Sequence, residues 1–290
     1  MTGTEFKAWC EKRVRLLDGA TGSNLRAAGM PAGVCAETWI LEHPQALQTL
    51  QEAYIAAGSE IVLAPTFGAN RALLANHRLE SCVQDYNRRL VSLSREAVGR
   101  RALLAGDMTT TGQPVLPEDT AVYARLLEIY TEQASALLEA DVDLFFVETM
   151  MGLTESMAAV EAIRALTDRA IVCTMSVQSD GRCYFDGSVY DAAQTLPELG
   201  ADAVGVNCSS GPDQLESVVR ALRAETTVPV AAKPNAGLPE IRDDGTAVYD
   251  MTPQAFAAHM TALISCGAAL VGGCCGTTPE HIRALHDAIR

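Results

Sequence analysis

The segment ALVGGCCGTTPEH, residues 269–281, contains the features that decide the fold of this chain. A short apolar run leads into two glycines and the adjacent cysteines Cys274 and Cys275. The Thr-Thr-Pro-Glu that follows is typical of a helix start, because a threonine cap and an early acidic residue both suit that end. A second segment, DAVGVNC at 202–208, has the same form and ends in Cys208. Each segment predicts a strand that turns directly into a helix.

Eight apolar runs of this kind occur along the chain. Short and continuously apolar runs are typical of parallel strands that are buried on both faces. The runs are VRLLDG (14–19), EIVLAPT (60–66), ALLAGDM (102–108), DLFFVET (143–149), AIVCTMSV (170–177), DAVGVNC (202–208), VPVAAKPN (228–235) and ALVGGCC (269–275).

Helical patterns lie between these runs. Apolar residues recur at helical spacing over 44–58 and 118–139, and further helix starts are expected at 252–253 and 277–280. Eight strand–helix alternations without a large shift in composition predict an α/β fold, a single (β/α)8 TIM barrel over residues 1–290. The alternative is an open doubly wound sheet, but no G-x-G-x-x-G follows the first run.

The composition and the charge of the chain disfavour several classes of protein. The 290 residues are 48% hydrophobic, and 36 acidic against 22 basic residues give a formal charge of −14, which disfavours nucleic-acid binding. No apolar run reaches the ~18 residues of a membrane span, and the first residues lack the apolar core of a signal peptide. Nine cysteines without disulfide-like spacing favour a reducing, cytoplasmic location, where cysteine clusters are typical of metal-binding or catalytic sites.

Three cysteines are the candidate metal ligands. Catalytic groups of such a barrel lie at the carboxyl ends of its strands, and the sixth and eighth strands have one neighbour between them. Cys208, Cys274 and Cys275 are therefore expected around one zinc ion with a vacant fourth position, which is typical of a catalytic site. The alternative is that Cys274 and Cys275 form a buried pair or a vicinal disulfide unrelated to Cys208. The other six cysteines are expected to have no part in the metal site, because nothing in the sequence places them near it.

Two carboxylates follow the first and fourth runs. Asp18 and Glu148 are expected to face the metal site, where a pair of carboxylates binds an ammonium group through charge-assisted hydrogen bonds. The alternative is that each caps a neighbouring loop. For Asp107 the loop role is preferred, in the segment GDMTTTG.

Three further residues are candidates for substrate binding. Thr66 and Phe67, in APTFGANR, follow the second run, where the hydroxyl would bind substrate and the ring would wall the pocket. Asn235 lies in the turn KPNAGLP after the seventh run, where backbone N–H groups are suited to a carboxylate. Packing and turn formation explain all three equally well.

Six segments together carry a family resemblance: LLDGATGSN, PTFGANR, VETM, VGVNCSSGP, KPNAGLP and GGCCGTTPEHI. In this order, from about residue 14 to the end, the chain resembles the homocysteine-binding domain of the zinc-dependent homocysteine S-methyltransferase family, and most of all its cobalamin-dependent branch. The resemblance implies zinc on Cys208, Cys274 and Cys275, and it implies that Asp18 and Glu148 orient the amino group of homocysteine. It also implies methionine as the product. The segment GDMTTTG departs from the family in lacking a proline before its threonine-glycine.

The sequence does not identify the methyl donor. The cobalamin fingerprint D-x-H-x-x-G is absent from the sequence. The donor is therefore expected to be methylcobalamin on a separate corrinoid protein, as similarity to the cobalamin-dependent branch favours, or a small molecule such as S-methylmethionine. Two other functions compete with methyl transfer: a homocysteine-binding module without turnover of its own, and a structural-zinc or thiol redox protein.

Overall fold

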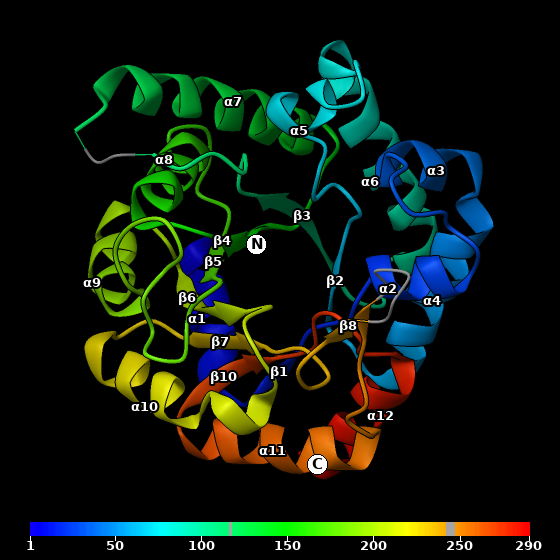
Figure 1. Ribbon diagram of the computed structural model, residues 1–290, viewed down its shortest axis with the longest axis vertical. Coiled ribbons are helices and arrows are strands. Elements are labelled where there is room, and N and C mark those ends of the chain that lie inside the picture. Colours follow the sequence, from blue (N-terminus) through cyan, green and yellow to red (C-terminus); the bar gives the residue numbers. More distant parts are fainter. Residues whose placement is uncertain (116–117, 242–246) are drawn as a thin grey trace.

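The computed structural model describes residues 1–115, 118–241 and 247–290 as a ring of eight parallel strands surrounded by helices (Figure 1). The predicted (β/α)8 barrel is confirmed, and each of its strands overlaps one of the eight apolar runs. The barrel strands are β1 (Arg15–Leu16), β2 (Ile61–Leu63), β3 (Leu103–Thr109), β4 (Leu144–Met150), β5 (Ile171–Met175), β6 (Ala203–Asn207), β7 (Val230–Lys233) and β10 (Ala268–Val271).

The order of the strands decides which residues meet. Parallel pairing runs β1-β10-β7-β6-β5-β4-β3-β2. A parallel bridge between Leu17 and Ile61 joins the two ends, supported by a 2.7 Å hydrogen bond from the Glu60 N–H to the Leu16 carbonyl. Only β7 separates β6 from β10, as the sequence predicts, so the two cysteine-bearing corners lie one strand apart.

Side chains on alternate strand positions fill the barrel interior. Ala105 on β3, Phe146 on β4 and Ala231 on β7 belong to one buried cluster, which Phe6 of helix α1 (Gly3–Glu11) joins from the amino-terminal end. Because strand side chains alternate between faces, the next inward positions lie two residues further on. The apolar filling therefore ends one layer below the carboxyl ends of the strands.

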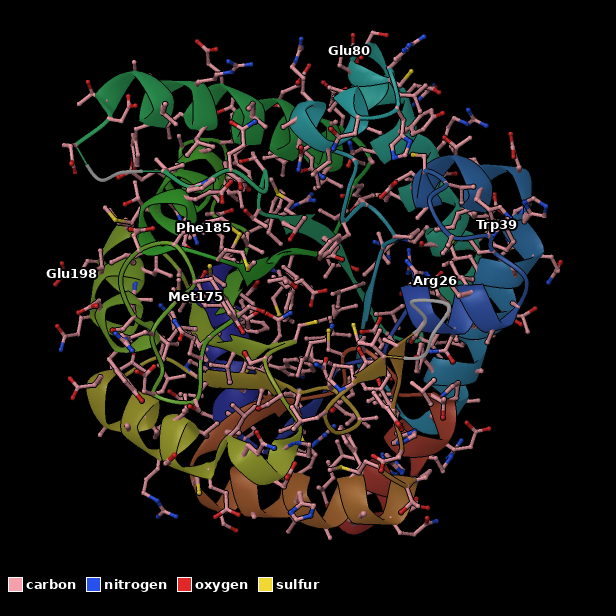
Figure 2. All side chains as sticks on the ribbon, in the orientation of Figure 1. Arg26, Trp39, Glu80, Met175, Phe185 and Glu198 are labelled. Atoms are coloured by element: carbon pink, nitrogen blue, oxygen red, sulfur yellow. The ribbon has the colours of Figure 1, made fainter. Side chains whose placement is uncertain are left out.

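Twelve α-helices among the described residues surround the ring, and side chains fill the space between the two layers (Figure 2). In that view Glu80 and Glu198 lie at the periphery, and Met175 lies inside. The helices are α1 (Gly3–Glu11), α2 (Gly22–Ala27), α3 (Ala36–Glu42), α4 (Pro44–Ala57), α5 (Arg71–Ala75), α6 (Val83–Val98), α7 (Thr120–Glu139), α8 (Leu153–Arg164), α9 (Val189–Leu199), α10 (Glu216–Glu225), α11 (Pro253–Ser265) and α12 (Pro279–Ala288). None of these helices is long and apolar enough to cross a bilayer.

The expected helices are present with small changes at their ends. Helix α4 stops before Gly58, which has a left-handed φ of 109°. Helix α7 begins at Thr120 because the Asp119 side chain accepts a 3.0 Å hydrogen bond from the Val122 N–H and so caps the first turn. The short antiparallel pair β8 (Glu240–Ile241) and β9 (Ala247–Val248) was not predicted, since two-residue strands on an exposed loop carry no periodic pattern.

The contact between β6 and β7 generates a stability prediction. A methyl group on Gly205 would lie 2.0 Å from the Ala231 carbonyl oxygen, and a backbone atom in a paired strand cannot move aside cheaply. Gly205→Ala is expected to lower the free energy of unfolding by about 2–3 kcal/mol in urea denaturation.

Gly22→Ala is the matched control, because no atom lies within 4 Å of the added methyl group. Alanine favours a helix over glycine, so the free energy of unfolding should stay the same or rise by up to about 1 kcal/mol. Equal midpoints for the two variants would contradict the close approach of β6 and β7.

Candidate active site

The three predicted cysteine ligands come together at the carboxyl ends of β6 and β10. The sulfurs of Cys208 and Cys275 are 3.5 Å apart, and the three sulfurs lie within 4.8 Å of one another. All nine cysteines are free thiols in the structure. Cys208 therefore lies beside the pair rather than apart from it.

Backbone hydrogen bonds to the last residue of β7 and to the residue that follows it hold both cysteine corners. The Cys208 N–H donates to the Lys233 carbonyl at 3.2 Å, and the Cys274 N–H donates to the Pro234 carbonyl at 2.7 Å. Cys208 itself has a φ of 52°, a left-handed conformation that costs free energy for a non-glycine residue and is frequent at functional sites. No side chain fits at Gly273, because a Cβ there would lie 2.4 Å from the Thr277 hydroxyl oxygen.

The three sulfurs fit a tetrahedral metal ion. Zinc–sulfur bonds of about 2.3 Å place thiolates in one tetrahedron roughly 3.8 Å apart, close to the spacing observed here. Hydrogen bonds from the thiols of Cys208 and Cys274 lower the pKa of Cys275, while hydrogen bonding with the other two sulfurs raises the pKa of Cys274. The ligand group found in the described part of the chain has three members, which suits a site that accepts a further ligand.

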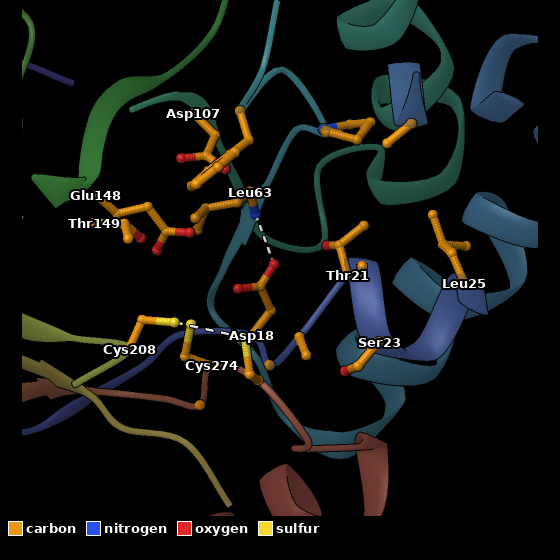
Figure 3. Close-up of a pocket in the computed structure, with 18 of the residues that line it drawn as sticks. Asp18, Thr21, Ser23, Leu25, Leu63, Asp107, Glu148, Thr149, Cys208 and Cys274 are labelled. Atoms are coloured by element: carbon orange, nitrogen blue, oxygen red, sulfur yellow. Dashed lines mark hydrogen bonds between the residues drawn. The ribbon is translucent and has the colours of Figure 1, made fainter. Parts of the chain in front are cut away.

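A cavity of about 270 Å³ opens beside these sulfurs (Figure 3). Its walls include Asp18, Asp107, Glu148 and Lys233 together with the three cysteines. Apolar side chains such as Leu25, Met30 and Ile40 line the rest. The cavity therefore combines an apolar wall with a compact charged cluster next to the sulfurs.

The two predicted carboxylates belong to this cluster and are paired with a lysine. Asp18 is 1% exposed, and its Oδ2 accepts a 2.8 Å hydrogen bond from the Leu63 N–H. The Lys233 ammonium lies 3.0 Å from Glu148 Oε2 and 3.5 Å from Asp18 Oδ1. Burial raises the pKa of Asp18 to about 6, although Lys233 acts in the opposite direction.

Lys233 is the main functional residue that the sequence interpretation missed. Its side chain is almost completely buried, and burial lowers its pKa, but Glu148 and Asp18 outweigh this effect and raise the pKa above its usual value. A signal was present in the run VPVAAKPN, because a lysine on the inward face of a buried strand requires a charged partner. The apolar pattern of the run predicts a strand followed by a turn and assigns no role to the lysine.

Asp107 differs from its expected loop role. The loop after β3 is held instead by Glu155 of α8, whose carboxylate accepts hydrogen bonds of 2.6 Å from both the N–H and the hydroxyl of Thr111. Asp107 is 5% exposed, lines the cavity, and has a buried Oδ1 without a hydrogen-bond partner. Burial and the nearby Glu148 raise its pKa well above the usual range.

The remaining candidates lie at different distances from the cavity. Phe67 lines it and is 37% exposed. Thr66 is fully buried, and its hydroxyl donates to the Asp107 carbonyl at 2.8 Å and accepts from the Asp107 N–H at 3.0 Å, so it positions β3. Asn235 is buried, and its side-chain oxygen has no hydrogen-bond partner.

Asn207 is a second residue that the sequence interpretation missed. Its side-chain oxygen accepts a 2.8 Å hydrogen bond from the Thr149 N–H, and its side-chain nitrogen donates to the Thr149 hydroxyl at 2.7 Å. These bonds connect the residue before Cys208 with the residue after Glu148. Thr149 has a φ of 60°, and the two hydrogen bonds offset the cost of this conformation.

The protein is therefore a (β/α)8 barrel, and the pocket at the carboxyl ends of its strands contains three thiols. The family model for homocysteine S-methyltransferase matches residues 15–289, and the chain belongs to this family. The chain is 31% identical over 297 aligned positions to methionine synthase of Mycobacterium tuberculosis, covering 96% of this chain and 25% of that protein. It is 30% identical to the Mycobacterium leprae methionine synthase, covering 99% and 25%.

The chain thus spans about a quarter of the length of the curated relatives it matches. Among solved structures, the metallated form of the homocysteine methyltransferase MmuM from Escherichia coli superposes with a TM-score of 0.80 at 23% identity, covering 97% of this chain and 99% of that one. At 23% identity, this structural similarity supports the assignment of the fold alone.

The thiol cluster generates a prediction about pH. Because the pKa of Cys275 is lowered, its thiolate persists as the pH falls below the ordinary thiol pKa of about 8.5. With chelator present, wild-type protein is expected to keep the ultraviolet absorbance of a thiolate at neutral pH, and Cys275→Ser is expected to lose it.

Cys173→Ala is the control, since burial raises the pKa of that thiol to about 12 and it contributes no thiolate at neutral pH. The same thiolate absorbance in all three proteins would show that the ionised sulfur lies elsewhere.

Proposed function

We propose that this protein is a zinc-dependent methyltransferase that moves a methyl group to the thiol of homocysteine and so forms methionine. The observation that carries the proposal is the convergence of three cysteine sulfurs within 4.8 Å beside a cavity lined by carboxylates. Membership of the homocysteine S-methyltransferase family supports the same reaction. No separate general acid or base is assigned beyond the zinc site.

Cys208, Cys274 and Cys275 would hold the zinc ion. When bound, zinc supplies Lewis acidity that favours the thiolate form of a sulfur substrate at neutral pH and fixes its position. The proton of the substrate thiol leaves to solvent, the sulfur–methyl bond forms, and the bond between the methyl carbon and the donor breaks. The chain itself contributes an apolar cavity that limits access of water to the thiolate.

Asp18 and Glu148 would orient the amino group of homocysteine, with Lys233 holding both carboxylates in place. Lys233 is itself fixed between them and lies 5.1 Å from the centre of the Phe146 ring. Phe67 would wall the cavity, and its ring is partly exposed. Asn235 is not among the residues that line the cavity, so its buried amide would act through the turn after β7, whereas Thr66 would act through the position of β3.

The methyl donor would be methylcobalamin carried by a separate corrinoid protein, or a small molecule such as S-methylmethionine. Similarity to two methionine synthases supports the corrinoid donor. A cytoplasmic location is proposed from the nine free cysteines, since thiols stay reduced there.

Loss of one zinc ligand tests the site. Cys208→Ala is expected to lose bound zinc and to reduce methyl transfer to homocysteine by at least about 100-fold, because two thiolates hold the ion too weakly. Zinc content and methionine formation are measured on the same sample. Cys82→Ala is the control and should keep both properties, since Cys82 is half-buried in a short helix directly before α6 and does not line the cavity.

The donor panel decides between the competing functions. Wild-type protein is assayed with homocysteine and with S-methylmethionine, S-adenosylmethionine, betaine, and free or protein-bound methylcobalamin. Turnover with any donor supports the transferase. Homocysteine binding without turnover would identify a binding module. Full activity in zinc-free Cys208→Ala would overturn the proposed mechanism.

A further inference from the structure

The charged cluster of the cavity has more acceptors than its own lysine can use. Lys233 donates to Glu148 Oε2 at 3.0 Å and lies at ion-pair distance, 3.5 Å, from Asp18 Oδ1. Neither Asp18 Oδ1 nor Asp107 Oδ1 has a hydrogen-bond partner, although both atoms are buried. Buried oxygens without partners are costly, and in a cavity wall they mark where a ligand donates hydrogen bonds.

The three carboxylates surround one space. Figure 3 shows Asp18, Asp107 and Glu148 reaching toward it from different strand ends, with the sulfurs of Cys208 and Cys274 beside it. Three carboxylates face a single lysine, so the cluster has two more negative than positive groups when all are ionised. A ligand that brings one ammonium group reduces this excess and removes unpaired acceptors.

Another carboxylate in the cavity wall has hydrogen-bond partners on both of its oxygens. Glu37 of α3 accepts a 2.9 Å hydrogen bond from the Gly68 N–H on one oxygen and a 3.3 Å hydrogen bond from the Cys35 thiol on the other. Its charge contributes to the cavity, but its oxygens already have partners. Asp107 therefore differs from Glu37 in having an oxygen available.

We propose that Asp107 determines the specificity of the site for acceptor thiols that carry a primary ammonium group. With Asp18 and Glu148 it lines the cavity that would receive such a group, and its buried Oδ1 is available there as an acceptor. Lys233 holds Glu148 and Asp18 in place and does not itself bind the substrate. This inference rests on the proposed transfer of methyl groups to homocysteine and names the residue that selects an α-amino thiol.

The test compares two thiols that differ in the amino group alone. Homocysteine and γ-mercaptobutyrate both carry the thiol and the carboxylate, but γ-mercaptobutyrate lacks the ammonium group. Dissociation constants are measured by calorimetry on zinc-loaded wild-type protein and on Asp107→Asn, with zinc content determined for each. Asp107→Asn keeps the shape of the side chain but cannot ionise to a carboxylate beside a bound ammonium group.

Asp107→Asn is expected to weaken binding of homocysteine by about 10- to 100-fold, the effect of losing one charge-assisted hydrogen bond. Binding of γ-mercaptobutyrate should stay within about 3-fold of wild type or improve, because the carboxylate has no partner in that ligand. The ratio of the two affinities is measured within one protein sample, so partial unfolding of the variant does not imitate the result.

Glu37→Gln is the matched control from the same wall. It also removes one carboxylate charge, but the affinity ratio of the two thiols should remain that of wild type. Equal losses of affinity for both thiols in Asp107→Asn, or an unchanged affinity for homocysteine, would overturn the assignment of Asp107.

The same binding measurements distinguish failure of this inference from failure of the proposed function. Wild-type protein that binds neither thiol would contradict the proposed homocysteine site itself. Wild-type protein that binds homocysteine well, with an unchanged affinity ratio in Asp107→Asn, would contradict the role of Asp107 alone.

Discussion

The buried ammonium of Lys233 is the interaction on which the charged part of the pocket depends. Asp18 and Glu148 are almost completely removed from water, and isolated buried carboxylates would take up protons rather than remain charged. The cation at 3.0 Å from Glu148 and 3.5 Å from Asp18 offsets part of that cost. A lysine is itself costly to bury, so the cation and the carboxylates have to be retained together.

The same short segment also fixes the sulfurs. The carbonyl of Lys233 accepts the hydrogen bond from Cys208, and the carbonyl of the next residue, Pro234, accepts the one from Cys274. The strand between the two cysteine corners therefore determines their separation through its backbone, while its last side chain determines where the carboxylates lie. The sulfurs and the carboxylates of the cavity are positioned by one element, so displacement of β7 would affect both.

The sequence predicted the barrel and the cysteine cluster for a physical reason. Eight apolar runs are a signal spread over the whole chain, and a parallel barrel places all carboxyl ends on one face. Whether Asp107 points into the cavity or caps its loop depends on the competing acceptor Glu155, which belongs to a distant helix and has no local pattern. The pairing of Lys233 and the connection made by Asn207 likewise depend on contacts between strands, which the spacing of residues along one strand does not reveal.

The charged layer of the cavity lies directly above the apolar filling of the barrel. Apolar residues such as Phe146 fill the interior up to the layer below, so the carboxylates and the sulfurs meet in a region with little water. Electrostatic interactions are stronger there than at the surface, which means that one ammonium group has a large influence on how a ligand is oriented. The carboxylates and the sulfurs of Cys208 and Cys274 line the same cavity, so under the proposed function an acceptor held by its amino group would have its sulfur beside the cysteines. That orientation would be a consequence of where the apolar filling ends.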